Sequence, residues 1–149
     1  MKPQINIRNK RATFDYEVIE TFTAGIVLYG YEVKSLQEGR GRISESHCAF
    51  KDNELFLYNS HIDRYKNSSP FVVTYEQVRP RKLLLNRREL NRLSKAIEQK
   101  GMTIIPLKLY RNDKGLIKVD IALAKGKHNY DKREAIKKRD IERESNLKF

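Results

Sequence analysis

The chain has 149 residues and carries 31 lysines and arginines against 19 aspartates and glutamates, a formal net charge of +12. This length fits one domain with an appended tail. Such an excess of positive charge destabilises a compact chain unless a polyanion neutralises it, so the composition indicates nucleic acid, an acidic protein or an anionic membrane surface as the partner.

The same composition excludes several classes of protein. The single cysteine, Cys48, excludes an intramolecular disulfide and a metal site built on several cysteines. The N-terminal residues lack the apolar core of a signal peptide, and no stretch approaches the roughly 20 apolar residues of a membrane span. We therefore expect a cytoplasmic protein that does not bind a membrane.

The first predicted elements follow a mobile basic arm, assigned to residues 1–8. β-Branched and aromatic residues predominate from Phe14 to Leu28, which predicts one long strand bent at Gly25. Residues 32–38 predict a short helix, and Gly39 is expected to end it.

Two predicted hairpins flank a longer helix. Residues 46–62 and residues 103–123 each alternate apolar and polar side chains on either side of a polar turn. Between them lie a loop at residues 63–75 and then a helix. Asn86 is placed to cap this helix, with Glu89 three residues later in the capping-box arrangement.

These elements predict a mainly β protein, an oligonucleotide-binding-type closed β-barrel with about three helices. An open α+β sheet would give nearly the same pattern, and the pattern does not decide between them. We expect the barrel over residues 9–124. Residues 125–149 hold nine basic and five acidic side chains and no continuous apolar stripe. They predict a tail that is disordered alone and helical when bound to a partner.

The sequence shows no catalytic constellation. The histidines His47, His61 and His128 have no second histidine or carboxylate at metal-ligand spacing on a shared helix face. A phosphate loop, a dinucleotide-binding turn and a serine nucleophile elbow are all missing. His47 beside Cys48 suggests a nucleophile pair, but neighbouring strand residues point to opposite faces. We therefore expect a protein that is not an enzyme and needs no metal or cofactor.

Two segments concentrate the positive charge. Residues 79–92 hold six lysines and arginines against one acid, interrupted by three leucines. This segment is either a solvated helix entry around a plug of buried leucines or a rim that contacts phosphates, and the net charge favours the rim. Residues 125–133 form the second segment, either a charged linker or a contact in which the ring of Tyr130 stacks on a base.

Six short segments then indicate a family. They are Asn9–Ala12, Ala24–Leu28, Glu32–Leu36, Arg81–Asn86, Pro106–Tyr110, and Ala124–Lys127 running into Asp131–Glu134. In this order and with this spacing the chain resembles the SsrA-binding protein family, also called small protein B (SmpB), from residue 9 to about residue 138. One departure is Thr23, where the family commonly has a glutamate that supports RNA binding.

The resemblance implies a partner and a process. A member of this family is expected to bind the tRNA-like domain of transfer-messenger RNA (SsrA) in place of the missing anticodon arm. With this RNA and elongation factor Tu it is expected to enter stalled ribosomes for trans-translation, which tags the nascent chain for degradation. The tail is expected to contact small-subunit RNA at the decoding centre and to probe the empty messenger channel. The protein is expected to be a monomer.

The resemblance, the basic rim and one candidate stacking ring together assign the site residues. Those expected at the RNA are Asn9, Lys10, Arg11, Tyr16, Lys34, Arg81, Lys82, Leu84, Lys118, Lys125 and Lys127. Those expected in the ribosome-binding tail are Tyr130, Asp131, Lys132, Arg133, Ile136 and Lys137.

Three other functions stay open on the residues alone. A general single-stranded nucleic-acid-binding protein would show stacking aromatics across its sheet and little preference for folded RNA. A ribosomal or assembly protein would stay on ribosomes without transfer-messenger RNA. A nuclease would need a catalytic site, which the sequence does not show.

Overall fold

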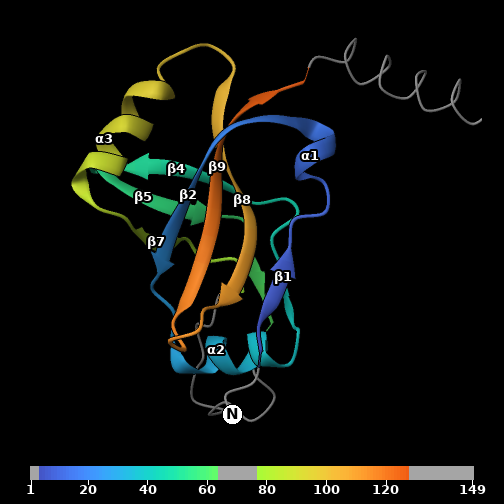
Figure 1. Cartoon of the computed structure of the whole chain (residues 1–149). Coiled ribbons are helices and arrows are strands. Elements are labelled where there is room, and N and C mark those ends of the chain that lie inside the picture. Colours follow the sequence, from blue (N-terminus) through green and yellow to red (C-terminus); the bar gives the residue numbers. More distant parts are fainter. Residues whose placement is uncertain (1–3, 64–76, 128–149) are drawn as a thin grey trace, which may run out of the picture.

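The computed structural model describes residues 4–63 and 77–127, and this part of the chain is mainly β (Figure 1). The strands are β1 (Asn6–Arg8), β2 (Tyr16–Ile26), β3 (Gly41–Arg42), β4 (His47–Lys51), β5 (Glu54–Tyr58), β6 (His61–Ile62), β7 (Arg81–Leu84), β8 (Met102–Arg111) and β9 (Ile117–Gly126). The helices are α1 (Ala12–Asp15), α2 (Gly30–Gln37) and α3 (Arg87–Ala96).

The main sheet runs round into a nearly closed antiparallel ring. Its strands follow the order β8-β4-β5-β7-β2-β9, and β9 pairs back with β8, while β1 lies outside β8. The long pairings are those of β9 with β2 and with β8, whereas β4 meets β8 through the single pair Cys48 and Ile104. A mainly β protein with about three helices is therefore confirmed, and the predicted tail beyond Lys127 lies outside the described residues.

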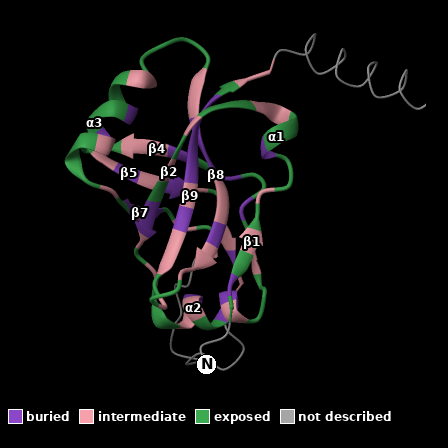
Figure 2. Ribbon diagram, viewed as in Figure 1, coloured by how far each residue is buried: buried purple, intermediate pink, exposed green. Residues whose placement is uncertain are grey.

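Aliphatic side chains fill the interior of the ring. Leu57 of β5, Leu93 of α3, and Val119 and Ile121 of β9 are fully buried in one core cluster. Figure 2 shows the buried residues along β9 and β8 at the centre of the molecule. Because side chains alternate along a strand, burial of Val119 and Ile121 places their neighbours Lys118 and Asp120 on the outer face.

A second, smaller cluster lies where α1 packs against this outer face. Ala12 of α1 is buried with Ile105, Ala122 and Ala124, and Tyr16 packs against them half-buried. The two alanines are small enough to let the helix approach the sheet closely. Phe14 and Asp15, predicted to begin a long strand, belong instead to α1, so that prediction is wrong. The packing of Ala12 winds this segment into a helical turn before β2 begins.

Other expectations are met with shifted bounds. Both hairpins form, as β4–β5 and β8–β9. The capping box of α3 forms as predicted: the Asn86 side chain accepts a hydrogen bond from the Glu89 amide at 2.8 Å, and the Glu89 carboxylate accepts one from the Asn86 amide at 3.3 Å. Most of the loop expected at residues 63–75 lies outside the described residues.

Several strands were not predicted, the short strand β3 (Gly41–Arg42) among them. Residues Asn6–Arg8, which we assigned to a mobile basic arm, pair with β8 instead. Residues Arg81–Leu84, which we assigned to a helix entry or a basic rim, form β7 between β5 and β2. The boundary between barrel and tail, expected after residue 124, falls inside β9, because Lys125 still pairs with Glu17 and with Met102.

Candidate nucleic-acid interface

The strand register places residues from five strands in one row across the outer face of the ring. Asn6 of β1 lies opposite Tyr110 of β8, which lies opposite Lys118 of β9. Lys118 in turn lies opposite Gly25 of β2, and Gly25 opposite Leu84 of β7. Because residues directly opposite one another in antiparallel strands share a face of the sheet, these side chains form one continuous surface.

A second row runs beside the first. Arg8 of β1 lies opposite Lys108 of β8, Lys108 opposite Asp120 of β9, and Asp120 opposite Thr23 of β2. We define the outer face as these two rows together. It carries Arg8, Lys108 and Lys118 against the single carboxylate of Asp120 among the residues of the two rows, so its net charge favours a polyanion.

Asp120 fixes the orientation of two neighbours. Its Oδ1 atom accepts hydrogen bonds from the Tyr110 hydroxyl at 3.0 Å and from the Thr23 hydroxyl at 3.2 Å. Burial raises the pKa of Tyr110 above its usual value, and the hydrogen bond to Asp120 and its charge raise the pKa further. The phenol therefore stays protonated at neutral pH and keeps its role as a donor. The Lys108 ammonium lies 5.0 Å from the centre of the same ring.

Leu84 gives this face an exposed apolar contact. Its side chain is 51% exposed although it belongs to a strand of the ring. A Cβ atom at Gly25 would come within 3.2 Å of the Leu84 Cβ, so glycine leaves room for Leu84 to lean across β2. An exposed leucine that only Gly25 separates from Lys118 is suited to contact with an unstacked base.

Toward the C-terminal end of β9, the outer face is bordered by α1 and the loop before it. The Asn9 side-chain amide donates to the Pro106 carbonyl oxygen at 2.8 Å, and its oxygen accepts from the Arg11 amide at 3.2 Å. Asn9 thus anchors the loop to β8, and it leaves Lys10 and Arg11 exposed. Lys127 joins this end, because its ammonium donates to the Thr13 carbonyl oxygen at 2.9 Å.

The structure separates two lysines that the sequence analysis placed together. Lys127 lies against α1, whereas Lys125 lines a groove beneath α3 with Arg92 and Ile19. Lys125 and Lys127 are two positions apart and would share one face if the strand continued. Because β9 ends at Gly126, the chain turns before Lys127 and the two side chains diverge. Tyr16 is half-buried against Ala12 and offers only part of its ring to a base.

Arg81 forms a buried ion pair. Arg81 and Glu32 of α2 are both 0% exposed, and the Glu32 Oε2 atom accepts from Arg81 Nε at 2.9 Å and from Nη2 at 2.6 Å. The remaining guanidinium hydrogens reach oxygens of Ser60, Gln77 and Arg79. All five donors of a guanidinium are thereby satisfied, so Arg81 has none left for a phosphate and holds α2 to β7 instead.

The other predicted cations are exposed to differing degrees. Lys82 is half-buried and pairs with Glu54 of the neighbouring strand β5 at 3.0 Å. Lys34 is exposed on α2, which lies at the same end of the ring as the β8–β9 turn (Figure 1). The six residues assigned to the ribosome-binding tail, residues 130–137, lie outside the described part of the chain.

Sequence reasoning missed Arg8, Lys108 and Tyr110. The alternation of Lys108 and Tyr110 about the buried Leu109 was a usable signal, since it places both on the polar face of β8. Arg8 carried no such signal, because only the long-range pairing of β1 with β8 brings it beside Lys108.

The described residues show no arrangement for catalysis. Cys48 is buried, which raises the pKa of its thiol, while the neighbouring His47 is exposed and stacks on Tyr58 with the ring centres 5.6 Å apart. Residues 4–63 and 77–127 contain no group of three or more histidine, cysteine, aspartate or glutamate side chains that could hold a metal ion. Nor do they contain a helix of the length and apolar character needed to cross a membrane.

Comparisons with known proteins agree along nearly the whole chain. A model of the family described as SmpB protein matches residues 6–149. The SsrA-binding protein of Flavobacterium johnsoniae is 51% identical over 144 residues, covering 97% of this chain and 94% of that protein. The SsrA-binding protein of Phocaeicola vulgatus is 49% identical over 150 residues, covering 100% and 99%. A solved structure described as "tmRNA-SmpB: a journey to the center of the bacterial ribosome" is similar with a TM-score of 0.69 and 44% identity, covering 91% of this chain and 95% of that one.

Proposed function

The chain belongs to the SmpB, or SsrA-binding protein, family, and on that premise we propose that its outer face is the surface that binds transfer-messenger RNA. Members of this family are RNA-binding proteins and not enzymes, and they act with transfer-messenger RNA in trans-translation on the ribosome. The protein acts in the same process, as a binding module.

The observation that carries the proposal is the meeting of predicted contacts on one surface. Lys118 and Leu84 share a row of the outer face, and Lys10 and Arg11 border the same face beside α1. Cations at both ends of the face, with an exposed apolar side chain separated from Lys118 only by Gly25, fit a folded RNA, whose phosphates need neutralising and whose unpaired bases need an apolar surface.

The affinity arises mainly from the release of counterions. With about six phosphates neutralised, a plot of the logarithm of the association constant against the logarithm of the salt concentration should have a slope of about −4 to −5. This range lies between the slopes expected for six phosphates of a single strand and six of a duplex. The selectivity arises from the shape of the folded RNA, because A-form grooves hide most base edges. We therefore assign Asn9 to positioning and Lys10, Arg11 and Lys118 to phosphate contact.

The wider assembly is part of the same proposal. The ring of strands is an oligonucleotide-binding-type barrel, and together with β1 and the helices it acts as the RNA-binding domain. The protein works in the cytoplasm as a monomer, and elongation factor Tu accompanies it to the ribosome. The residues that follow β9, which ends at Gly126, form the tail, and the tail becomes helical in the messenger channel against small-subunit RNA at the decoding centre. The change to a strongly charged composition there supports this division.

A filter-binding titration tests the proposal. Transfer-messenger RNA is titrated with the full chain at moderate salt and competed with excess total tRNA. We expect tight binding that survives the competition. Binding that tRNA removes easily would instead identify a non-specific basic protein.

In a second arm, deletion of residues after 129 should leave RNA affinity nearly intact and abolish tagging on stalled ribosomes. Loss of most RNA affinity on deletion would place the tail in the primary RNA site.

A further inference from the structure

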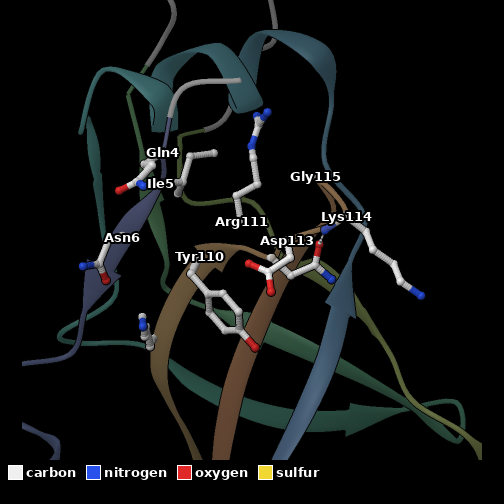
Figure 3. Close-up of a pocket in the computed structure, with 10 residues that line it drawn as sticks. Gln4, Ile5, Asn6, Tyr110, Arg111, Asp113, Lys114 and Gly115 are labelled. Carbon is white, nitrogen blue, oxygen red and sulfur yellow. Dashed lines mark hydrogen bonds between the residues drawn. The ribbon is translucent and has the colours of Figure 1, made fainter. Parts of the chain in front are cut away.

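A pocket opens at the end of the first row of the outer face, between β1 and the turn that joins β8 to β9 (Figure 3). Its volume is about 510 Å³, within the roughly 300–1,000 Å³ of small-ligand sites. Its lining includes Asn6, Tyr110, Arg111, Asp113 and Lys114. We propose that this pocket holds one unstacked nucleotide of the bound RNA, an inference that rests on the proposed function and extends the outer face to its end.

The first requirement for such a site is a fixed aromatic ring. Tyr110 lines the pocket, and the hydrogen bond from its hydroxyl to Asp120 at 3.0 Å sets the plane of its ring. The Lys108 ammonium lies 5.0 Å from the ring centre and also lines the pocket. A ring held in place loses little entropy when a base stacks on it, and the lysine adds charge for the adjoining phosphate.

The second requirement is a set of groups that match the edge of a base. The side-chain amides of Gln4 and Asn6 each carry donors and an acceptor, and they make no hydrogen bond to another described residue. Figure 3 shows them across the pocket from Asp113, whose carboxylate lies beside Tyr110. The two amides offer hydrogen-bond donors and acceptors on one side of the pocket, and the Asp113 carboxylate offers an acceptor on the other. Such a set suits the polar edge of a nucleobase.

The third requirement is positive charge for the phosphate. Arg111 and Lys114 line the pocket beside Lys108, so the cations outnumber the carboxylate of Asp113 among the lining residues. Figure 3 shows the Arg111 and Lys114 side chains directed away from Tyr110 and Asp113. Lys108, whose ammonium lies 5.0 Å from the centre of the Tyr110 ring, is therefore the cation placed for the phosphate of a stacked nucleotide.

The turn itself is rigid enough to be a preformed wall. The Asn112 side-chain oxygen accepts from the amides of Lys114 at 3.0 Å and Leu116 at 2.9 Å, and the Asn112 amide donates to the Leu116 carbonyl at 2.8 Å. Gly115 adopts φ +81°, which glycine allows without strain. The pocket also adjoins Lys118, which lies opposite Tyr110, so an RNA strand on the outer face passes its mouth.

A nuclear magnetic resonance titration of the full chain tests the site directly. AMP, GMP, CMP and UMP are added in turn, and inorganic phosphate serves as the control. We expect saturable shifts of the Asn6, Tyr110 and Gly115 amides with at least one mononucleotide and much smaller shifts with phosphate. Absence of saturable shifts at these amides overturns the inference. Equal shifts with phosphate would also overturn it, since they would identify a simple anion site.

Variants connect the pocket to RNA binding. Asn6→Ala removes an exposed side chain that makes no described hydrogen bond, and Tyr110→Leu removes the stacking ring. Asn91→Ala, at an exposed position of α3 away from this pocket, is the matched control. Loss of one stacked base should weaken binding to transfer-messenger RNA about tenfold for Tyr110→Leu. Asn6→Ala should weaken binding of transfer-messenger RNA several-fold. Because Asn6 is exposed, this variant tests the pocket even if Tyr110→Leu fails to fold. Unchanged affinity in Asn6→Ala overturns the inference.

The two proposals fail separately. If the wild-type chain selects transfer-messenger RNA over tRNA while the mononucleotide shifts are absent, the pocket is wrong and the proposed function stands. If the shifts appear but the wild-type chain shows no selectivity, the pocket binds nucleotides and the proposed RNA partner is wrong.

Discussion

Replacing Glu32 by alanine should destabilise the fold severely without removing an RNA contact. The change would leave the Arg81 guanidinium, 0% exposed, without the carboxylate that accepts from its Nε and Nη2 atoms at 2.9 and 2.6 Å. It would also remove the acceptor for the Tyr29 amide at 2.8 Å, which begins α2. Breaking a buried pair from one side costs about 3–5 kcal/mol, because the remaining charge stays buried and unpaired.

Thermal unfolding followed by circular dichroism measures this loss. At about 2–4 °C per kcal/mol for a chain of this size, the midpoint should fall by roughly 6–20 °C. The control is Glu54→Ala, which breaks the half-exposed pair with Lys82 and should cost about 1 kcal/mol or less. Equal midpoints for the two variants would refute the structural role of Glu32. Below its midpoint, Glu32→Ala should bind RNA with nearly the same salt slope, because Arg81 is 0% exposed and its charge is not presented to the RNA.

Three further outcomes follow from the same structure. Lys108→Ala should weaken binding of transfer-messenger RNA and make the salt slope shallower by about one unit, as a titration at several salt concentrations would show. Asn86→Ala should lower the free energy of unfolding in urea by about 1 kcal/mol through loss of the α3 cap. Because burial raises the pKa of its thiol, Cys48 should react with a disulfide reagent at pH 8 far more slowly in the native protein than in urea.

Local patterns predicted those elements whose stability is local. The capping box at Asn86 and the alternation in β9 both follow from neighbouring residues, and both appear in the structure. β7 was missed because an arginine at its first position suggested a solvent-exposed segment. Arg81 is instead buried through Glu32, which lies 49 positions away in the sequence.

The candidate site was predictable only in part for the same reason. Lys118 and Leu84 were identified by resemblance, but nothing local in the sequence shows that Gly25 lies between them. Likewise, residues 6–8 are too short to predict as a strand, and β8 supplies the pairing that orders them. The composition of an element can therefore indicate its type, whereas the face it shares with others depends on register.

The most direct test of the central claim is the affinity of Lys118→Glu for transfer-messenger RNA in the presence of competing tRNA. Lys118 lies at the middle of the first row of the outer face, and Lys51→Glu, exposed at the β4–β5 turn, is the matched charge reversal. If the outer face binds the RNA, Lys118→Glu should weaken binding at least tenfold, about 1.4 kcal/mol, and Lys51→Glu far less. Equal affinities of the two variants would contradict the assignment of the outer face as the RNA-binding surface.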